Sequence, residues 1–270
     1  MTRHEIMTIK QLHVTAASQN ILRDISFNLK QGEIVAVVGE SGCGKTTLLK
    51  AIANLLAPNL QIKADAIVIN AQDVREFSKR QWRRIRGNQI AMIFQNPYFF
   101  FSPVKKIKAH FIQAIRNHQN FTKEQAIEKS RKILQTLNFS EADARRVLDS
   151  YAFELSGGML QRVSIALAIV LQPSILLADE PTSALDVITQ QQILEELLQL
   201  RKVSNTSIIM ITHDLGCAAY IADRIIVMHK GKIIESAPTA TLLSNPQETY
   251  TKKLLLATPR WLGDDTVYAK

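Results

Sequence analysis

The stretch "EIVAVVGESGCGKT", Glu33 to Thr46, decides the fold. Its first half is an unbroken apolar run rich in β-branched residues, which is the pattern of a buried parallel strand. Its second half satisfies the pattern G-x-x-x-x-G-K-[ST], with glycines that allow a tight loop before a helix. Such a loop wraps phosphate groups with backbone N–H donors, so the stretch predicts a phosphate site between a strand and a helix.

The loop residues are expected to divide the work of holding a nucleotide. Lys45 is expected to bridge the β- and γ-phosphate oxygens, and the Thr46 hydroxyl is expected to ligate Mg²⁺. Cys43 stands at a variable position of the motif, where filling space is favoured over thiolate chemistry. The nucleotide-binding residues expected from this loop are Gly39, Glu40, Ser41, Gly42, Cys43, Gly44, Lys45, Thr46 and Thr47.

Two further apolar runs have the same character, "SILLADE" from Ser174 to Glu180 and "SIIMITH" from Ser207 to His213. Helical patterns lie between the strands, at Thr46 to Ala57, Met159 to Leu171 and Thr189 to Val203. Strands that alternate with helices predict an α/β fold with a mainly parallel sheet covered on both faces.

Other segments interrupt this alternation. The polar stretch from Thr122 to Asp149 has helical periodicity and no strand signal, so it predicts an inserted helical lobe. The stretch "RIIVMHKGKIIES", Arg224 to Ser236, predicts a hairpin that turns at Gly231. Past Pro238 a short helical tail is expected, ending at Thr258-Pro259 with a frayed polar end.

The second strand ends in two neighbouring carboxylates, Asp179 and Glu180. An isolated Asp-Glu pair is usually a solvated turn, but this pair follows a hydrophobic strand at the edge where α/β sheets bind ligands. Asp179 is therefore expected to serve Mg²⁺, and Glu180 to hold an attacking water. Gln95, which closes the run "IAMIFQ", is expected to reach Mg²⁺ or the water, and His213 to reach the γ-phosphate; a capping or core histidine is the alternative.

The stretch "ELSGGMLQR", Glu154 to Arg162, places a serine and two glycines directly before an apolar-periodic helix. Such a helix start carries bare backbone N–H groups and a positive dipole end, so it predicts a second anion site. The predicted second site has no magnesium ligand and no water-holding acid, so we expect it to bind the phosphate of another subunit. The alternative is a helix cap satisfied by Ser156 within one chain, which accounts for the serine but not for Gly157 and Gly158 together.

The composition is that of an ordinary globular chain of 270 residues with a formal net charge of +9. Its apolar runs fall short of the ~18 residues that a membrane-spanning helix needs, and no signal-like N-terminus is present. Two cysteines, Cys43 and Cys217, form neither a zinc spacing nor a disulfide framework, which favours a reducing, cytosolic compartment. The positive charge would suit nucleic acid, the anionic inner face of a membrane, or solubility alone.

Taken in order, GESGCGKT, Gln95, LSGGMLQR, ILLADE, SALD and His213 resemble the nucleotide-binding subunits of ATP-binding cassette (ABC) transporters, from about residue 6 to 260. The resemblance implies ATP and Mg²⁺ as cofactors. It also implies a P-loop NTPase (RecA-like) fold, in which a mainly parallel sheet core carries an N-terminal antiparallel β region and an inserted α-helical subdomain. It places the ATPase core in residues 1–95 and 156–238, the helical subdomain with a coupling groove in residues 96–155, and a short helical tail in residues 239–270.

In that family the Ser-Gly-Gly turn caps the ATP of a second subunit, and two nucleotides lie between the subunits of a head-to-tail dimer. The partner would be a related ATPase chain or a second copy. With the resemblance included, the expected catalytic residues are Glu180, His213 and Gln95, and the expected metal contacts are Thr46, Gln95 and Asp179. The nucleotide contacts expected outside the loop are Gln95, Asp179, Ser156, Gly157, Gly158, Gln161 and Asp186.

Within the family, the chain resembles the importers of nickel and of di- and oligopeptides. The cues are "QNP" from Gln95, "FELSGGMLQR" from Phe153, "DEPTSALDV" from Asp179, and the tail "NPQETYTKKLLLATP" from Asn245. The Met-Leu pair after the glycines and the "RVL…Y" lead from Arg146 look closest to the first of the two ATPase subunits of nickel importers. The resemblance therefore implies nickel or a metal complex as cargo, with di- or oligopeptides as the alternative.

The resemblance also implies partners: two transmembrane permease subunits, and through them an external solute-binding protein, at the cytoplasmic face of a bacterial cell membrane. The aromatic run from Tyr98 to Phe101 is expected either to pack inside or to dock the permease. A cassette ATPase acting on DNA or ribosomes is a competing class, disfavoured because there is one cassette and neither a long coiled coil nor a zinc module. No nucleic acid partner is expected. A catalytically idle regulatory subunit is a third possibility.

Two features depart from the family pattern. The family stacks adenine on an aromatic residue at about the position of Ala16, and no aromatic residue stands near it here, which leaves the base contact open. Some peptide-importer ATPases carry a cysteine cluster in a longer C-terminal extension. This chain lacks those cysteines, so no iron–sulfur centre is expected.

Overall fold

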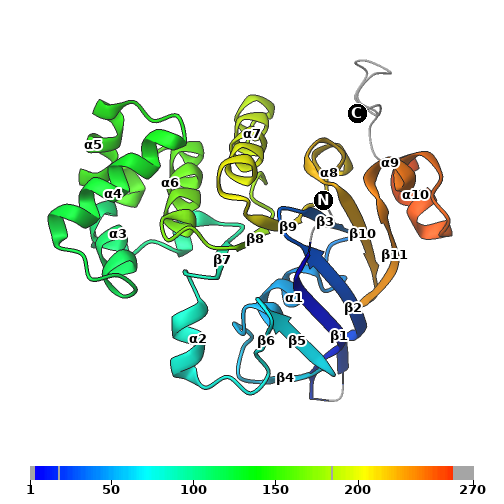
Figure 1. The fold of residues 1–270 in the computed structure, drawn as a ribbon. Helices are drawn as coiled ribbons and strands as arrows, with labels where there is room; N and C mark the ends of the chain where they lie inside the picture. The colour runs from blue at the N-terminus through cyan, green and yellow to red at the C-terminus, as the bar shows by residue number, and fades with distance from the viewer. Residues whose placement is uncertain (1–3, 18, 184, 258–270) are drawn as a thin grey trace.

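The computed structural model describes residues 4–17, 19–183 and 185–257, which form a six-stranded and a five-stranded sheet with helices packed around them (Figure 1). The strands are β1 (Glu5–Ala16), β2 (Gln19–Lys30), β3 (Ile34–Val38), β4 (Leu60–Lys63), β5 (Ala66–Ile69), β6 (Gln72–Asp73), β7 (Ile90–Ile93), β8 (Ile175–Asp179), β9 (Ser207–Ile211), β10 (Arg224–His229) and β11 (Lys232–Pro238). The α-helices are α1 (Lys45–Ile52), α2 (Lys79–Ile85), α3 (Ile107–Arg116), α4 (Lys123–Thr136), α5 (Glu141–Asp149), α6 (Gly157–Ile169), α7 (Val187–Ser204), α8 (Leu215–Ile221), α9 (Thr239–Ser244) and α10 (Thr249–Ala257), with 3-10 turns η1 (Pro97–Phe99) and η2 (Ala152–Glu154). No helix in these ranges is both long and apolar enough to cross a bilayer.

The six-stranded sheet runs in the order β11-β10-β3-β9-β8-β7, and every neighbouring pair is parallel except β10 with β11. All residues of β3, β8 and β9 are buried, because the sheet is covered on both faces. Along β3, Ile34, Ala36 and Val38 enter one hydrophobic core, whereas Val35 and Val37 enter the other. The structure confirms the α/β class and the mainly parallel core that the sequence predicts.

The five-stranded sheet is antiparallel, in the order β2-β1-β5-β6 with β4 paired to β1. Helix α1 lies between the two sheets (Figure 1), where Leu48 and Ile52 share one core with Leu22 of β2. The β10–β11 hairpin turns at Lys230 and Gly231, both with left-handed backbone, as the sequence predicts. Helix α1 and the loop before it are therefore packed between the antiparallel sheet and the parallel sheet.

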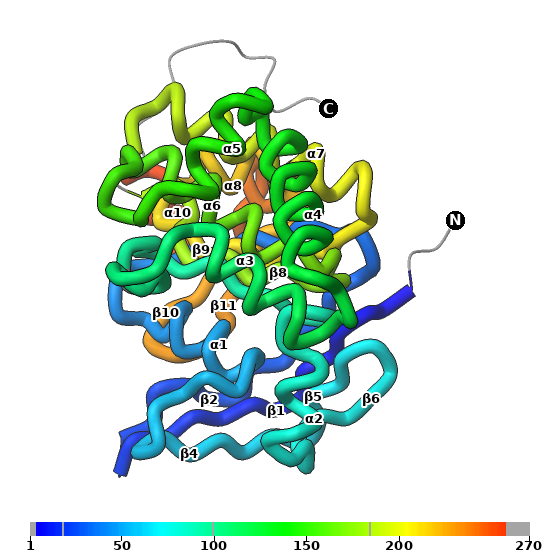
Figure 2. The backbone as a smooth tube through the Cα atoms, turned by 90° about the vertical axis from the view of Figure 1, so that its left-hand side faces the viewer, coloured from blue at the N-terminus to red at the C-terminus, as the bar shows by residue number. Residues whose placement is uncertain are grey.

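Helices α3, α4 and α5 pack together and against α6, beyond the β7 edge of the sheet (Figures 1 and 2); we call α3 to α5 the helical lobe. The helical lobe predicted from Thr122 to Asp149 contains two helices, α4 and α5, which separate where Asn138 takes a left-handed φ of 60° and Ser140 caps α5. Helix α3 lies within the predicted helical subdomain 96–155 but was not predicted as a separate element, although buried apolar residues recur at every fourth position from Ile107 to Ile115.

The structure corrects the predicted end of α1 and leaves the predicted end of the C-terminal tail untested. Helix α1 ends at Ile52, five residues before the predicted Ala57, because Asn54 takes a left-handed φ of 51° and breaks the helical backbone. Past Pro238 the chain forms α9 and α10, but the predicted tail end at Thr258-Pro259 lies outside the described residues.

A charged residue lies buried where α7 packs against α6. The Glu196 side chain is 2% exposed, and its Oε1 atom lies 3.9 Å from Nη1 of Arg162 on α6. The Arg162 guanidinium in turn lies over the ring of Phe139, 5.1 Å from its centroid. Burial raises the pKa of the Glu196 carboxyl to about 7, although Arg162 and Asn138 act to lower it. The ionised form of Glu196 therefore destabilises the folded state.

The pKa of Glu196 predicts a pH dependence of stability. The pKa of Glu196 is higher in the folded than in the unfolded chain. The protonated side chain therefore contributes its full stability below about pH 4.5. This contribution falls as the pH rises to about 7, and it is absent above that pH. Glu196→Gln removes the ionisation and keeps the shape. We expect it to raise the free energy of unfolding at about pH 8 by up to about 3 kcal/mol, and by much less at about pH 5.

Urea unfolding of both chains at the two pH values measures this gain. Glu195→Gln, an exposed neighbour on the same helix, is the control. An equal gain at both pH values would contradict the assignment to ionisation.

Candidate nucleotide site

The loop between β3 and α1 has the backbone of a phosphate cradle. Gly39, Gly42 and Gly44 have φ angles of 149°, 80° and 105°, which side-chain-bearing residues rarely adopt. A Cβ atom on Gly39 would lie 2.2 Å from the carbonyl oxygen of Met228, and one on Gly44 would lie 2.7 Å from Cδ2 of Leu22. The loop therefore lies directly on β10 and β2, and only glycine fits at these two contacts.

The side chain of Lys45 is buried under the loop. Its Nζ atom donates to the carbonyl oxygens of Gly39 at 2.7 Å and Glu40 at 2.9 Å, and contacts Sγ of Cys43 at 3.8 Å. The Cys43 side chain is itself buried, and burial raises the pKa of its thiol. Cys43 is therefore a neutral, space-filling thiol. The carbonyl groups of the loop orient the ammonium group of Lys45.

The first residues of α1 meet the end of β8. Thr46 Oγ1 donates to Asp179 Oδ1 at 3.0 Å, although the two residues lie far apart in sequence. Burial raises the pKa of Asp179, and the nearby charge of Glu180 adds to this, while the Thr46 hydrogen bond opposes it. A hydroxyl and a carboxylate are the oxygen ligands that Mg²⁺ prefers, and a cation here would favour the charged form of Asp179. The two residues therefore fit a Mg²⁺ site.

Three strand ends converge on the carboxylate of Glu180. Gln95, just past β7, donates from Nε2 to Glu180 Oε2 at 3.0 Å, and Nδ1 of His213, past β9, lies 3.4 Å from the same oxygen. Glu180 itself has a φ of 47°, a left-handed backbone that costs energy for a residue with a side chain. The sequence predicts that Gln95 and His213 reach metal, water or phosphate; the structure places both side chains on Glu180, which fixes its carboxylate.

The predicted second anion site lies at the start of α6. Ser156 caps this helix, because its Oγ atom accepts from the N–H of Met159 at 3.3 Å. A Cβ atom on Gly158 would lie 2.9 Å from Cγ2 of Thr189 on α7, so close packing explains this glycine. A Cβ atom on Gly157 would meet nothing within 4 Å, and its backbone is not left-handed. Nothing in the described part of this chain requires glycine at position 157.

Two other predicted contacts are placed differently. Gln161 is 3% exposed within the packing of α6, and its contact with nucleotide stays a prediction. Asp186 is exposed at the start of α7, where its carboxylate accepts from the N–H of Thr189 at 3.0 Å and from the hydroxyl of Thr189 at 2.7 Å. Asp186 thus has a capping role, and its contact with nucleotide stays a prediction.

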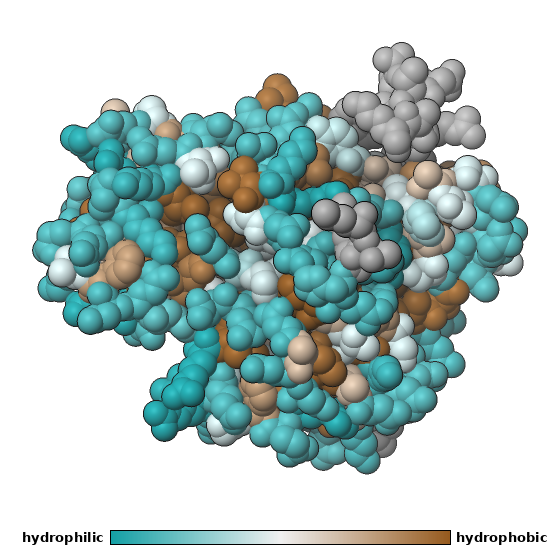
Figure 3. All heavy atoms as spheres, in the orientation of Figure 1, coloured by the Kyte–Doolittle hydropathy of each residue, from teal (hydrophilic) through white to brown (hydrophobic). Residues whose placement is uncertain are grey.

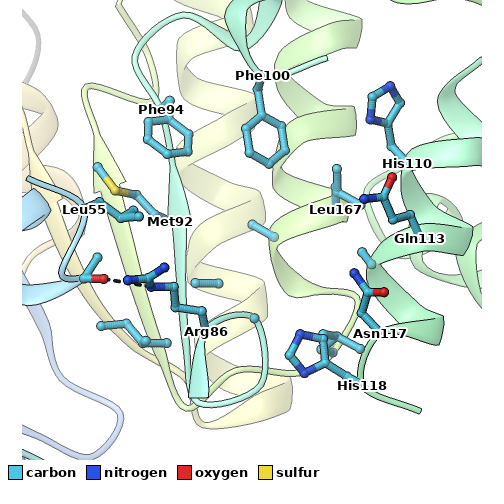
Figure 4. Close-up of a pocket in the computed structure, with 17 residues that line it drawn as sticks. Leu55, Arg86, Met92, Phe94, Phe100, His110, Gln113, Asn117, His118 and Leu167 are labelled. Carbon is cyan, nitrogen blue, oxygen red and sulfur yellow. Dashed lines mark hydrogen bonds between the residues drawn. The ribbon is translucent and has the colours of Figure 1, made fainter. Parts of the chain in front are cut away.

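A groove lies between the helical lobe and the rest of the chain (Figure 4); we call it the lobe groove. Part of its lining comes from residues 96–155, where the resemblance implies a coupling groove. Its volume is about 420 Å³. Figure 3 shows apolar surface in the region between the lobe and the core, on a face that is otherwise mostly hydrophilic. Residues from several separate segments line the groove, some of them outside the stretch 96–155. The apolar lining includes Leu55, Met92, Phe94, Phe100 and Leu167, and the polar lining includes Arg86, His110, Gln113, Asn117 and His118.

The aromatic run from Tyr98 to Phe101 was expected either to pack inside or to dock a permease, and its described rings differ in burial. Phe101 is buried and packs edge-on against His110, with ring centroids 5.1 Å apart. Tyr98 and Phe100 are 47% and 43% exposed, and Phe100 lines the lobe groove. One ring therefore belongs to the core, and two present apolar surface to solvent.

Comparisons with known proteins agree with this geometry. A family model described as ABC transporter matches residues 22–183. The chain is 40% identical over 240 residues to a probable peptide ABC transporter ATP-binding protein of Sinorhizobium fredii, covering 88% of this chain and 71% of that protein. It is 35% identical over 264 residues to the dipeptide transport ATP-binding protein DppD of Lactococcus lactis, covering 96% of this chain and 75% of that protein.

The fold is also similar to a solved structure, the ATP-binding cassette MJ0796 as a dimer in a post-hydrolysis state bound to ADP and Pi. The TM-score is 0.76 at 26% sequence identity, and the match covers 86% of this chain and 98% of that one.

The cluster at Glu180 predicts the effect of removing its charge. Glu180→Gln keeps the shape and a hydrogen bond to Gln95 but cannot accept a proton from water, so we expect the rate of ATP hydrolysis to fall by roughly 10²-fold or more. ATP binding, measured by equilibrium titration, should stay near the parent value, since the Lys45 contacts are unchanged. Hydrolysis by this variant at the parent rate would remove Glu180 from the role of water-holding base.

Proposed function

We propose that this chain, which belongs to the ABC transporter family of ATPases, uses ATP hydrolysis to energise the import of di- or oligopeptides through a membrane permease. The observation that supports the cargo is the 40% identity, over most of both chains, with a probable peptide transporter subunit. The site geometry supports the hydrolytic part. Work with such a permease would put the chain at the cytoplasmic face of a bacterial membrane.

Each part of the site has a role in this hydrolysis. The backbone N–H groups from Ser41 to Thr46, together with Lys45, would hold the triphosphate, and Thr46 and Asp179 would hold Mg²⁺. That ion would supply charge neutralisation on the transferring phosphoryl group. Glu180 would hold the attacking water and take its proton, with Gln95 and His213 keeping the carboxylate in place. A carboxylate fixed before the reaction needs little reorganisation, which lowers the barrier.

The open position at Gly157 supports a site completed by a second subunit. The cap at Ser156 and the packing at Gly158 are explained within one chain, whereas Gly157 is not. A helix start with an unobstructed backbone is the surface that an incoming phosphate needs. We therefore place the start of α6 over the ATP bound by a partner ATPase subunit, in a head-to-tail dimer.

The lobe groove is the proposed docking site for the permease. It is apolar at Leu55, Phe94 and Phe100, and burial lowers the pKa values of His110 and His118, which favours their neutral forms. A groove of this kind suits a short helix with an apolar face. Phe94, which lines the groove, directly precedes Gln95, which contacts Glu180. A change at the Glu180 cluster on ATP binding would therefore move the groove and the permease segment bound in it.

Peptides replace nickel as the preferred cargo. The sequence features pointed first to nickel, with di- or oligopeptides as the alternative, but the relatives described above are named for peptide and dipeptide transport. The same relatives disfavour a cassette that acts on nucleic acid. A solute-binding protein outside the cell would deliver the peptide to the permease.

Substitutions at the paired glycines separate a structural role from a role toward a partner. Gly157→Asp places an acid at a helix start, which favours folding, but repels a partner's triphosphate. We expect a melting temperature no lower than that of the parent, unchanged ATP binding, and ATP hydrolysis reduced by roughly 10²-fold. Gly158→Ala should instead lose about 1–2 kcal/mol of stability against Thr189. Calorimetry and phosphate release measure both; a fully active Gly157→Asp variant would argue against the partner site.

Uptake assays test the cargo and the groove together. In cells that lack this chain, the parent gene should restore uptake of a labelled dipeptide and not of radioactive nickel; the reverse result would overturn the peptide proposal. Phe100→Asp, which charges the lobe groove, should abolish uptake and co-purification with the permease while basal ATP hydrolysis persists. Val203→Asp, at an exposed apolar residue near the end of α7, is the control and should retain uptake.

A further inference from the structure

The phosphate loop is held from behind by the C-terminal part of the chain. Besides the packing of Gly39 on β10, the N–H of Gly231 in the hairpin turn donates to the carbonyl oxygen of Cys43 at 3.0 Å. Nδ1 of His229, at the end of β10, lies 3.1 Å from Oε1 of Glu40. The hairpin therefore contacts the loop at its beginning and at its middle.

Helix α10 adds a contact that the sequence did not indicate. The ring of Tyr250 packs at a tilt of 33° against that of His229, with centroids 4.1 Å apart, and its hydroxyl accepts from the N–H of Glu40 at 3.1 Å. The start of α10 is anchored, because Glu235 of β11 accepts from the N–H groups of Gln247 at 2.8 Å and Glu248 at 3.1 Å. Tyr250 thus reaches the loop from a fixed position.

Tyr250 and Lys45 act on opposite ends of one peptide group. The carbonyl of Gly39 accepts from Nζ of Lys45, and the N–H of the same Gly39–Glu40 peptide donates to the hydroxyl of Tyr250. The described peptides include no cis bond, and in a planar trans peptide the C=O and N–H point in opposite directions. Fixing the N–H on Tyr250 therefore directs the carbonyl toward Lys45.

We propose that Tyr250, supported by His229, is a positioning residue for ATP binding, which aims Lys45 before the nucleotide arrives. Two donors of the Lys45 ammonium are bound to strong carbonyl acceptors, and the third contacts the weak acceptor Cys43 Sγ at 3.8 Å. A phosphate oxygen would replace the sulfur while the carbonyl contacts persist. Helix α10 thereby sets the affinity for ATP from behind the loop, without touching the nucleotide.

Tyr250→Phe in the purified full chain tests this proposal, because it removes the hydroxyl and keeps the ring. Loss of one oriented hydrogen bond should raise the Kd for the fluorescent analogue mant-ATP by roughly fivefold. The KM for ATP should rise in parallel, while kcat stays within about twofold of the parent value. Tyr250→Ala, which also removes the ring contact with His229, should have the larger effect. Tyr220→Phe, at a half-exposed tyrosine of α8, is the matched control and should change neither constant.

The competing role is that Tyr250 only anchors α10. In that case Tyr250→Phe would lower the melting temperature and leave Kd and KM at the parent values, which would overturn the proposal. A loss of kcat with unchanged Kd would overturn it as well. These measurements need neither permease nor cargo, so their outcome is independent of whether the chain serves peptide import.

Discussion

The site depends on a strand that has no exposed face. Because β3 is buried alternately in two hydrophobic cores, it cannot shift or rotate without exposing one of them. Its neighbours β9 and β8 are buried in the same way and run parallel to it. The ends of these strands are therefore held at one edge of the sheet. The phosphate loop, His213 and the Asp179-Glu180 pair owe their proximity to this constraint.

The sequence predicts the parts of the site that follow from strand ends. A dense β-branched run marks β3, and similar runs mark β8 and β9, so parallel pairing alone brings Thr46 close to Asp179. The local backbone was harder to predict. The left-handed residue Asn138 lies between α4 and α5, and the left-handed residue Asn54 ends α1 early, although asparagine also occurs inside helices. Such breaks depend on tertiary packing that periodicity does not encode.

The contacts between individual side chains were the hardest feature to predict from the sequence. Gln95 was expected to reach Mg²⁺ or the attacking water, and His213 the γ-phosphate; in the structure both side chains contact Glu180, which has a left-handed backbone. Gln161 follows the glycines in sequence, but helical geometry turns it into the core. Contacts such as that between Glu40 and Tyr250 join residues more than two hundred positions apart, and no local pattern announces them.

The contact between Gly158 and Thr189 has a consequence for timing in the proposed dimer. Thr189 follows Glu180 by only nine positions, and the α7 start that it belongs to presses on the helix that faces the neighbouring subunit. A change around Glu180 in one nucleotide site would then reach the opposite site through the contact between Thr189 and Gly158. The two sites would communicate, and the rate would depend sigmoidally on ATP concentration, which steady-state kinetics of the assembled dimer can reveal.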